Sequence, residues 1–273
     1  MFGRRVSLSQ RRVMLGGMLY TAPTIVVASY NIHRAVGLDG QRSPTRVAAV
    51  IDSLDADLIA LQEVEWGLPA HEAWLEMYAE RRGYALLVDP NIEDHRGRFG
   101  NVLLTRHPVR LADRIDLKVG RFEPRGAIAA RIDFYGTPHL VVATHLGLRI
   151  RERRRQTAQI AAYLNGCESM PSILLGDLNE WQWRSRSIRA IAKLYAKAPS
   201  PRSFPSWRPV FALDRILFRN MVDHPIVRTC KTPLSRIASD HLPVVARFHV
   251  ADATGGPRAI AHPSELSRTG GVS

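Results

Sequence analysis

A carboxylate and an amide follow the apolar run Ile173 to Leu175 at a spacing of two residues, as Asp177 and Asn179. The run predicts a short buried strand, and Gly176 lets the backbone leave it tightly. If the strand geometry persists, both side chains project from the same face of the strand end. Such a pair can serve a metal ion, a water molecule or a phosphate. An Asp-x-Asn after a strand also occurs as a turn or a helix cap, so this stretch leaves both interpretations open.

Polar side chains also stand at the ends of other apolar runs. Each has an ordinary structural explanation: a solvated carboxylate, a histidine satisfied in the core, an ion pair or a turn. Together they predict one pocket, because strand ends can converge on a single site. These further residues are Asn31, Glu63, His145, Asp214, Asp240 and His241.

The residues at these strand ends offer carboxylate and amide oxygens, which are hard metal ligands, and the imidazoles of two histidines. No cysteine or serine nucleophile stands out in the sequence, and it has no glycine-rich phosphate loop between a strand and a helix. Carboxylates and amides suit Mg²⁺ or Mn²⁺ better than zinc. We therefore expect Mg²⁺, with Mn²⁺ as a substitute.

The elements that must position these residues are mostly strands. Hydrophobic periodicity predicts helices at residues 45–54, 71–82, 150–164 and about 187–196. Runs rich in β-branched and apolar residues predict strands at 24–30, 57–61, 84–88, 101–104, 111–117, 127–134, 139–143, 173–175, 213–218, 225–228 and 243–250. Residues 89–98 and 199–209 are expected to be loops. No repeat and no linker interrupts the strands, so we expect one α/β domain with two sheets.

The two ends of the chain differ from this domain. We expect residues 1–23 to be a basic, disordered arm, residues 24–250 to be the domain, and residues 251–273 to be a disordered tail. Arg11 and Arg12 faintly resemble a twin-arginine export signal. The apolar stretch behind them is at the short limit for such a signal, so export is not expected. No run approaches the ~20 apolar residues of a membrane span, and we expect a soluble, cytoplasmic protein.

The composition supports a globular, basic protein. Hydrophobic residues make up 45% of the chain, enough for a sizeable core. The net charge of +13 favours an anionic partner such as nucleic acid, a lipid headgroup or another phosphorylated substrate, although an arginine-rich proteome gives the same figure. Four arginines of the arm, at positions 4, 5, 11 and 12, leave +9 for the remainder. Cys167 and Cys230 have no neighbours at metal-ligand spacing, which excludes zinc-thiolate sites.

Six short motifs together resemble the endonuclease/exonuclease/phosphatase superfamily, which includes DNase I-like nucleases, exonuclease III-like repair enzymes, sphingomyelinases and inositol-phosphate phosphatases. The match runs from about Ile25 to Phe248 and its motifs follow the typical order. They are Tyr30-Asn31-Ile32-His33, Leu61-Gln62-Glu63-Val64, Thr144-His145-Leu146, Gly176-Asp177-Leu178-Asn179, Leu213-Asp214-Arg215-Ile216 and Ser239-Asp240-His241-Leu242-Pro243. The resemblance implies a DNase I-like four-layer α/β sandwich, with two central, mainly antiparallel sheets flanked by helices and the active site along one edge.

The resemblance also implies roles for single residues. Glu63 would be the principal metal ligand, with Asn31 and Asp240 beside the metal or its waters. Asp214 and His241 would form an Asp–His pair that supports the imidazole's charge.

In addition, Asp177 and Asn179 would position or activate water and hold the phosphate. His145 resembles the second histidine of the DNase I-like and sphingomyelinase branches. The repair branch commonly has an acidic residue where this chain has His33, which weakens an abasic-site repair function.

The expected activity is metal-dependent phosphodiester hydrolysis, and we expect a monomeric enzyme without a stable protein partner. In-line attack needs charge neutralisation, a base and donors for phosphoryl oxygens. Arg98, Asn101 and Arg125 could contact phosphate, or they could have surface or structural roles. Which residue abstracts the proton is left open between His241 and Asp177.

Nucleic acid is the working assignment for the substrate, supported by the basic charge and the run of arginines within residues 151–155. Such a run is also typical of a solvated helix face. A phospholipid or small phosphorylated molecule is the alternative, because Trp181, Trp183 and Trp207 flank the expected site without an obvious stacking spacing. A non-catalytic binding protein on the same fold would require a broken set of motifs, and all six are intact.

Overall fold

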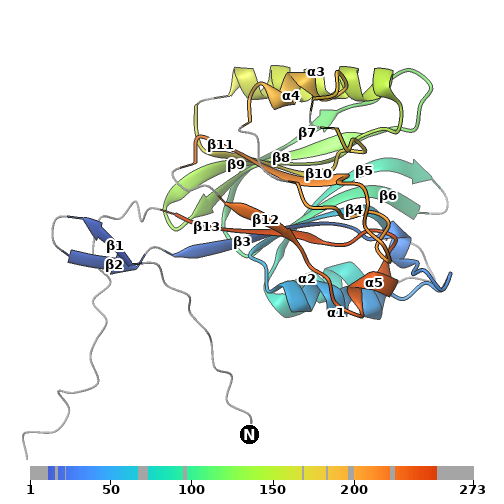
Figure 1. Ribbon diagram of the computed structural model, residues 1–273, viewed down its shortest axis with the longest axis horizontal. Helices are drawn as coiled ribbons and strands as arrows, with labels where there is room; N and C mark the ends of the chain where they lie inside the picture. Colours follow the sequence, from blue (N-terminus) through green and yellow to red (C-terminus); the bar gives the residue numbers. More distant parts are fainter. Residues whose placement is uncertain are drawn as a thin grey trace, which may run out of the picture.

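The computed structural model describes residues 12–15, 18–21, 23–66, 73–94, 97–167, 169–182, 184–195, 200–221 and 225–250. Two sheets pack face to face between two layers of helices (Figure 1). This arrangement is the four-layer α/β sandwich that the sequence predicts.

The lower sheet in Figure 1 has six strands, and the upper sheet has five. In spatial order, the six-stranded sheet consists of β12 (Ile226–Thr229), β13 (Val244–His249), β3 (Thr24–Asn31), β4 (Leu58–Trp66), β6 (Gly97–Thr105) and β5 (Ala85–Asp94). The five-stranded sheet consists of β11 (Asp214–Arg219), β10 (Ser172–Asp177), β9 (Thr137–His145), β8 (Gly126–Phe134) and β7 (Val109–Asp116).

Helices cover the outer face of each sheet (Figure 1). Below the six-stranded sheet lie α1 (Pro44–Leu54), α2 (Trp74–Arg82) and α5 (Ser235–Ala238), and above the five-stranded sheet lie α3 (Ile150–Gly166) and α4 (Arg189–Ala192). A short 3-10 turn, η1 (His33–Ala35), follows β3. On α1, Val47, Val50, Ile51 and Leu54 are buried against the sheet, as their helical spacing predicts.

The main core lies between the two sheets. It contains Ile25 and Leu103 from one sheet and Ile128, Val141 and Phe134 from the other, all at most 2% exposed. Strand residues alternate between faces, so each sheet also presents an apolar outer face to its helices. The domain is therefore built from three apolar clusters stacked through four layers.

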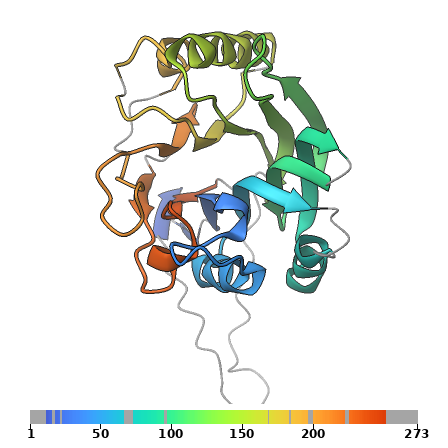
Figure 2. The same ribbon diagram turned by 90° about the vertical axis from the view of Figure 1, so that its right-hand side faces the viewer.

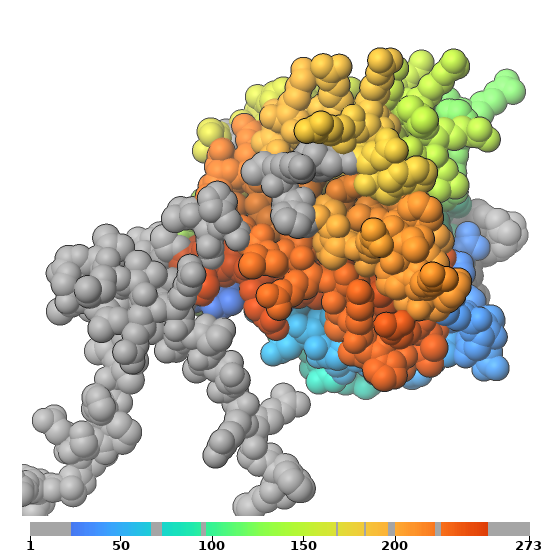
Figure 3. Space-filling view, in the orientation of Figure 1, coloured from blue at the N-terminus to red at the C-terminus, as the bar shows by residue number. Residues whose placement is uncertain are grey.

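Each sheet contains one parallel pair, β3 with β4 and β9 with β10, and its other pairs are antiparallel. The carboxyl ends of these four strands therefore point to the same end of the sandwich as the amino ends of β11 and β13. Figure 2 views the molecule from this end. In the space-filling view, the orange to red segment that contains β11 and β13 lies between the yellow upper part and the blue lower part (Figure 3).

Most predicted strands and helices are confirmed, but three predictions of local structure were wrong. The predicted loop 89–98 is largely the hairpin of β5 and β6, whose polar residues sit on extended strands with a bulge between Pro90 and Ile92. Strand β4 continues past Leu61 to Trp66 through a bulge. The helix expected at about 187–196 is the single turn α4, while η1 and α5 are too short for periodicity to reveal.

The ends of the chain remain mostly outside the described residues, including the tail 251–273 and residues 1–11. Within the predicted arm, β1 (Arg12–Leu15) and β2 (Met18–Thr21) pair as an antiparallel hairpin. Among the described residues, no helix is both long and apolar enough to cross a lipid bilayer. Cys167 and Cys230 are both free thiols.

Candidate active site

Asp177, the last residue of β10, lies at the centre of the polar residues gathered at this end of the sandwich. Its register partners are His145, the last residue of β9, and Asp214, the first residue of β11. Gly176 allows Asp177 to lie here, because its backbone has a φ of +147°, a value that residues with a Cβ rarely adopt. A Cβ there would lie 1.8 Å from the carbonyl oxygen of Thr144. The close approach of β10 to β9 at Gly176 and Thr144 brings Asp177 beside His145.

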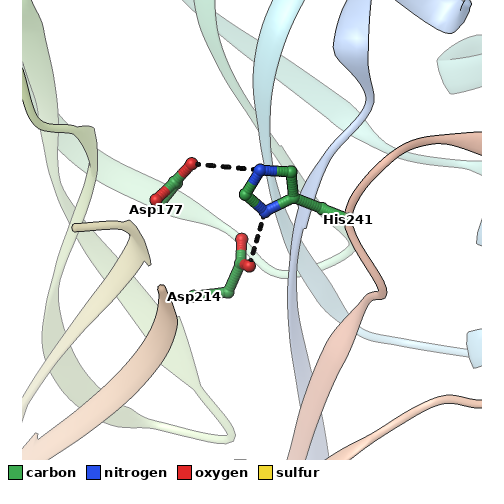
Figure 4. Close-up of side chains that lie close together, drawn as sticks. All are labelled: Asp177, Asp214 and His241. Carbon is green, nitrogen blue, oxygen red and sulfur yellow. Dashed lines mark hydrogen bonds and ion pairs between the residues drawn. The ribbon is translucent and has the colours of Figure 1, made fainter. Parts of the chain in front are cut away.

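Asp214 and His241 form the predicted Asp–His pair. The two side chains are 2.8 Å apart, from Nδ1 of His241 to Oδ2 of Asp214, and both are buried (Figure 4). Ser203 donates to the same Oδ2 at 2.5 Å and fixes the carboxylate from behind. Burial alone lowers the pKa of His241, but the charges of Asp214 and Asp177 outweigh it and raise the pKa to about 10. The imidazole is therefore held protonated at neutral pH in the absence of a metal.

Asp177 connects the two sheets. Its Oδ2 accepts a hydrogen bond at 3.1 Å from Nδ2 of Asn31, the last residue of β3 in the other sheet. The same oxygen lies 3.5 Å from Nε2 of His145 and 3.7 Å from Nε2 of His241. One buried carboxylate oxygen thus faces an amide and two imidazoles.

Glu63 reaches the site through a backbone irregularity. The bulge in β4 lies between Leu61 and Val64, and Glu63 adopts a φ of +55° within it. Bulges of this kind redirect a side chain at functional sites. Asn31 donates to Oε1 of Glu63 at 3.1 Å with the same nitrogen that contacts Asp177. The carboxylates of Glu63 and Asp177 are therefore brought together around one amide.

Asp240 lies beside this group on the segment before β13. Ser239 anchors that segment, because its hydroxyl donates to the carbonyl oxygen of Asn31 at 2.7 Å and approaches Oδ1 of Asp240 at 3.3 Å. The Asp240 carboxylate is 3.9 Å from Nδ1 of His33 and is partly exposed. It is positioned at the mouth of the site and not in its buried part.

Asn179 forms the turn that was one of the two interpretations left open by the sequence, and its side chain also reaches the site. It leaves the strand with a φ of +51°, and its backbone N–H donates to Oδ1 of Asp177 at 2.9 Å, which is an Asx turn. Its side-chain amide donates to the carbonyl oxygen of Leu146 at 2.8 Å and lies 3.1 Å from Nε2 of His145. The turn therefore orients the site residues.

His145 is held as a neutral imidazole. Its Nδ1 lies 3.0 Å from Nη1 of Arg125, and its Nε2 lies 3.1 Å from Nδ2 of Asn179, and both of these neighbours can only donate. A neutral imidazole accepts at one nitrogen, so we assign the acceptor to Nδ1, beside the charged guanidinium, and the proton to Nε2, 3.5 Å from Oδ2 of Asp177. The amide of Asn179 then keeps its hydrogen bond to the carbonyl oxygen of Leu146 and makes none to His145. Burial, together with the charge of Arg125, lowers the pKa of His145 to about 3. His145 therefore presents a neutral N–H donor toward Asp177, whereas His241 presents a charged one.

Among the predicted phosphate contacts, Arg125 joins the site through His145, while its ion pair with Glu123 spans 3.4 Å. Asn101 is buried and donates to the carbonyl oxygen of Gly126 at 3.0 Å, a structural contact. Arg98 forms an exposed ion pair of 2.8 Å with Glu93 on the neighbouring strand. A phosphate-binding role of these three residues stays a prediction.

The donor set fits a divalent metal ion. Carboxylates of Glu63, Asp177, Asp214 and Asp240 concentrate negative charge here, and the buried Oδ1 of Asp214 has no hydrogen-bond partner among the described residues. Ligand atoms of Asp177, Asp214 and His241 lie within 4.8 Å of one another. Nδ1 of His241 and Oδ2 of Asp214 already bond each other, and the ligand roles expected of Glu63, Asn31 and Asp240 stay a prediction.

A buried polar network behind the site was not evident from the sequence. Arg153 of α3 pairs with Glu180 at 3.2 Å and donates to the carbonyl oxygen of Leu148 at 2.6 Å. It thereby fixes the segments that follow His145 and Asp177. The arginine run of α3 is thus only partly a solvated face: Arg151, Arg154 and Arg155 are exposed, whereas Arg153 is buried.

Three comparisons place this chain among known proteins. The sequence pattern of the "Endonuclease/Exonuclease/phosphatase family" matches residues 28–241. The chain is 28% identical over 244 residues to the "Uncharacterized protein YbhP" of Escherichia coli strain K12, covering 82% of this chain and 96% of that protein. Among solved structures, an endonuclease/exonuclease/phosphatase from Beutenbergia cavernae superposes with a TM-score of 0.64 and 24% identity, covering 84% of this chain and 72% of that one. A truncated TDP2 of Caenorhabditis elegans gives a TM-score of 0.59 and 17% identity, with 83% and 98% covered.

Proposed function

The chain belongs to the endonuclease/exonuclease/phosphatase family, and we propose that within it this protein is a divalent-metal-dependent phosphodiester hydrolase. The single observation that carries the proposal is the Asp177 carboxylate, which is placed between the charged His241 and the neutral His145. A carboxylate in that position can orient or deprotonate a water, while the two N–H groups face the same point.

The proposed roles follow from the contacts. Asp177 holds the attacking water, and His241, kept protonated by Asp214, donates to a phosphoryl oxygen as charge develops. His145, whose proton sits on Nε2, supplies a second donor without adding charge. A metal ion held by Glu63, with Asn31 and Asp240 beside it, would supply charge neutralisation at the phosphoryl group.

Two substrate classes suit this chemistry. The net charge of +13 supports nucleic acid, the working assignment from the sequence. A phospholipid is supported by the exposed apolar residues around the site, including Trp181 at 54% and Trp207 at 60% exposure. The reaction at phosphorus is the same for both classes.

The test is hydrolysis of bis(p-nitrophenyl) phosphate with Mg²⁺ or Mn²⁺ by the full chain and two variants. We expect His241→Ala to lose about 10²- to 10⁴-fold in kcat while remaining folded, because it removes the group that handles charge in the transition state. His249→Ala is the matched control, since His249 is the last residue of β13, the strand that follows His241, at the end of the strand away from the site. His241→Ala activity within a few-fold of wild type would refute the proposed role.

A substrate panel then separates the classes. It contains plasmid DNA, single-stranded RNA, sphingomyelin, phosphatidylglycerol and phosphatidylinositol phosphates. Nuclease activity that falls steeply with salt and disappears in His241→Ala supports nucleic acid. Cleavage of lipid alone supports the second class, and no cleavage of any substrate favours a binding protein on this fold.

A further inference from the structure

Exposed apolar side chains are concentrated at the end of the sandwich that carries the site. Nine of the 13 exposed large apolar residues among the described ones lie at that end, in its loops, in the turn α5 or at the first residue of α3. We define the apolar rim by the six that the argument uses: Phe122, Leu148, Ile150, Trp181, Trp207 and Phe211. Large exposed apolar groups gathered in one region mark an interaction surface, whereas scattered ones do not.

The rim residues are tied to the site by short stretches of chain. Leu148 is three residues after His145, and Trp181 is four residues after Asp177. Phe211 precedes Asp214 by three residues, and the rings of Trp181 and Phe211 are in contact, with centroids 5.0 Å apart. The segments after β10 and before β11 therefore join into one apolar projection beside the site.

The other side of the rim is built in a similar way. Phe122 precedes Arg125 by three residues, and the guanidinium of Arg149 lies over its ring, 5.7 Å from the centroid. Arg149 stands between Leu148 and Ile150, which are 71% and 59% exposed. The segments that lead to Arg125 and away from His145 thus form a second projection. Figure 2 looks onto the end that bears both.

Arginines are interleaved with these apolar groups. Those of the same segments are exposed: Arg121, Arg149, Arg184, Arg186, Arg208 and Arg236. Their acidic neighbours are already engaged, because Glu123 pairs with Arg125 and Glu180 is buried against Arg153. The rim segments therefore carry positive charge beside apolar groups. This combination matches an interface of anionic headgroups over acyl chains.

We infer that the apolar rim docks this end of the protein onto a membrane that contains anionic phospholipid, with the site facing the headgroups. Nucleic acid fits the rim less well. Aliphatic Leu148 and Ile150 offer no face for base stacking, the Trp181 and Phe211 rings contact each other, and Arg149 lies over Phe122. The inference rests on the proposed function only for the identity of the reaction, and it makes a phospholipid phosphoester the substrate class.

The experiment is vesicle co-sedimentation of the full chain in EDTA, which needs no turnover. Vesicles of phosphatidylcholine with an equal share of phosphatidylglycerol are compared with vesicles of phosphatidylcholine alone. We expect at least 10-fold tighter binding to the anionic vesicles, together with a blue shift of tryptophan fluorescence. The double variant Leu148→Asp, Ile150→Asp should bind at least 10-fold more weakly than wild type.

Ile226→Asp is the matched control, because Ile226 is 63% exposed on β12, outside the rim. It should bind within two-fold of wild type. Trp207→Ala is the second variant if the double variant does not fold, and a loss of several-fold is expected. Circular dichroism establishes folding in each case.

The inference is overturned if the rim variants and Ile226→Asp bind vesicles alike, if wild type does not prefer anionic vesicles, or if plasmid DNA is bound and vesicles are not. Its failure is distinguishable from failure of the proposed function. Vesicle binding without hydrolysis of bis(p-nitrophenyl) phosphate would refute the hydrolase and leave the docking. Hydrolysis of bis(p-nitrophenyl) phosphate without vesicle binding would refute the docking and leave the hydrolase.

Discussion

The two site histidines make the stability of the metal-free protein depend on pH in opposite directions. The pKa of His241 is raised to about 10, so its folded form holds a proton that the unfolded chain has lost. That stabilisation is fully present below pH 6.5, the ordinary histidine value, and is lost as the pH rises from 6.5 toward 10. At 1.36 kcal/mol per pH unit, raising the pH from 7 to 9 should lower the free energy of unfolding by about 3 kcal/mol.

His145 acts on the acid side. Its pKa is lowered to about 3, so below pH 6.5 the unfolded chain takes up a proton that the folded protein does not. Stability should therefore fall as the pH drops from 6.5 toward 3, by about 2 kcal/mol at pH 5. The two contributions together place the maximum stability of the metal-free protein close to pH 6.5.

The assay is urea denaturation in EDTA at pH 5, 6, 7, 8 and 9, with wild type, His241→Asn, His145→Gln and the control His249→Asn. His241→Asn should flatten the alkaline limb and leave the acid limb, whereas His145→Gln should do the opposite. Groups distant from the site titrate equally in wild type and variants, so the differences between the curves report each histidine together with the site charges that it faces. An alkaline slope in His241→Asn equal to that of wild type would refute the reasoning.

Three further substitutions test single contacts. Glu63→Gln should raise the Mg²⁺ concentration needed for half-maximal activity by about 10- to 100-fold, and an unchanged metal titration counts against its ligand role. Arg153→Met should lower the free energy of unfolding by about 3 to 5 kcal/mol because it leaves Glu180 buried without its cation, and adding Glu180→Gln should restore part of the loss in urea titrations. Gly176→Ala should cost about 3 kcal/mol or more by the same measurement, since its Cβ would overlap the carbonyl oxygen of Thr144; a loss below 1 kcal/mol contradicts the close approach.

The sequence was sufficient for the sandwich and for the main members of the site. Buried strands such as β3 and β10 are continuous apolar runs, so each polar residue that follows them, Asn31 or Asp177, is conspicuous. The family resemblance supplied the pairing of Asp214 with His241, which the structure shows as a 2.8 Å contact. Short-range spacing alone could not have paired residues from two sheets.

Other features depend on tertiary contacts that local sequence does not encode. Ser203 lies in a segment without periodicity, yet it supports Asp214. Glu180 and Arg153 look like ordinary surface charges in the sequence, and they are buried because two segments cross beneath the site. The outer part of the β5 and β6 hairpin was predicted as the loop 89–98, because strands that extend beyond a core do not need apolar alternation.

The candidate site is divided between the two sheets, so it forms only in the finished fold. Asn31 and Asp177, 146 residues apart, meet only after the sheets have stacked. The segment carrying Asp240 and His241 is placed by β13, which inserts between β12 and β3 near the end of the domain. During synthesis, a nascent chain that lacks β13 has no Asp–His pair and no support for Asn31 from Ser239. The proposed hydrolase activity therefore requires the complete fold, and we do not expect it from a nascent chain on the ribosome.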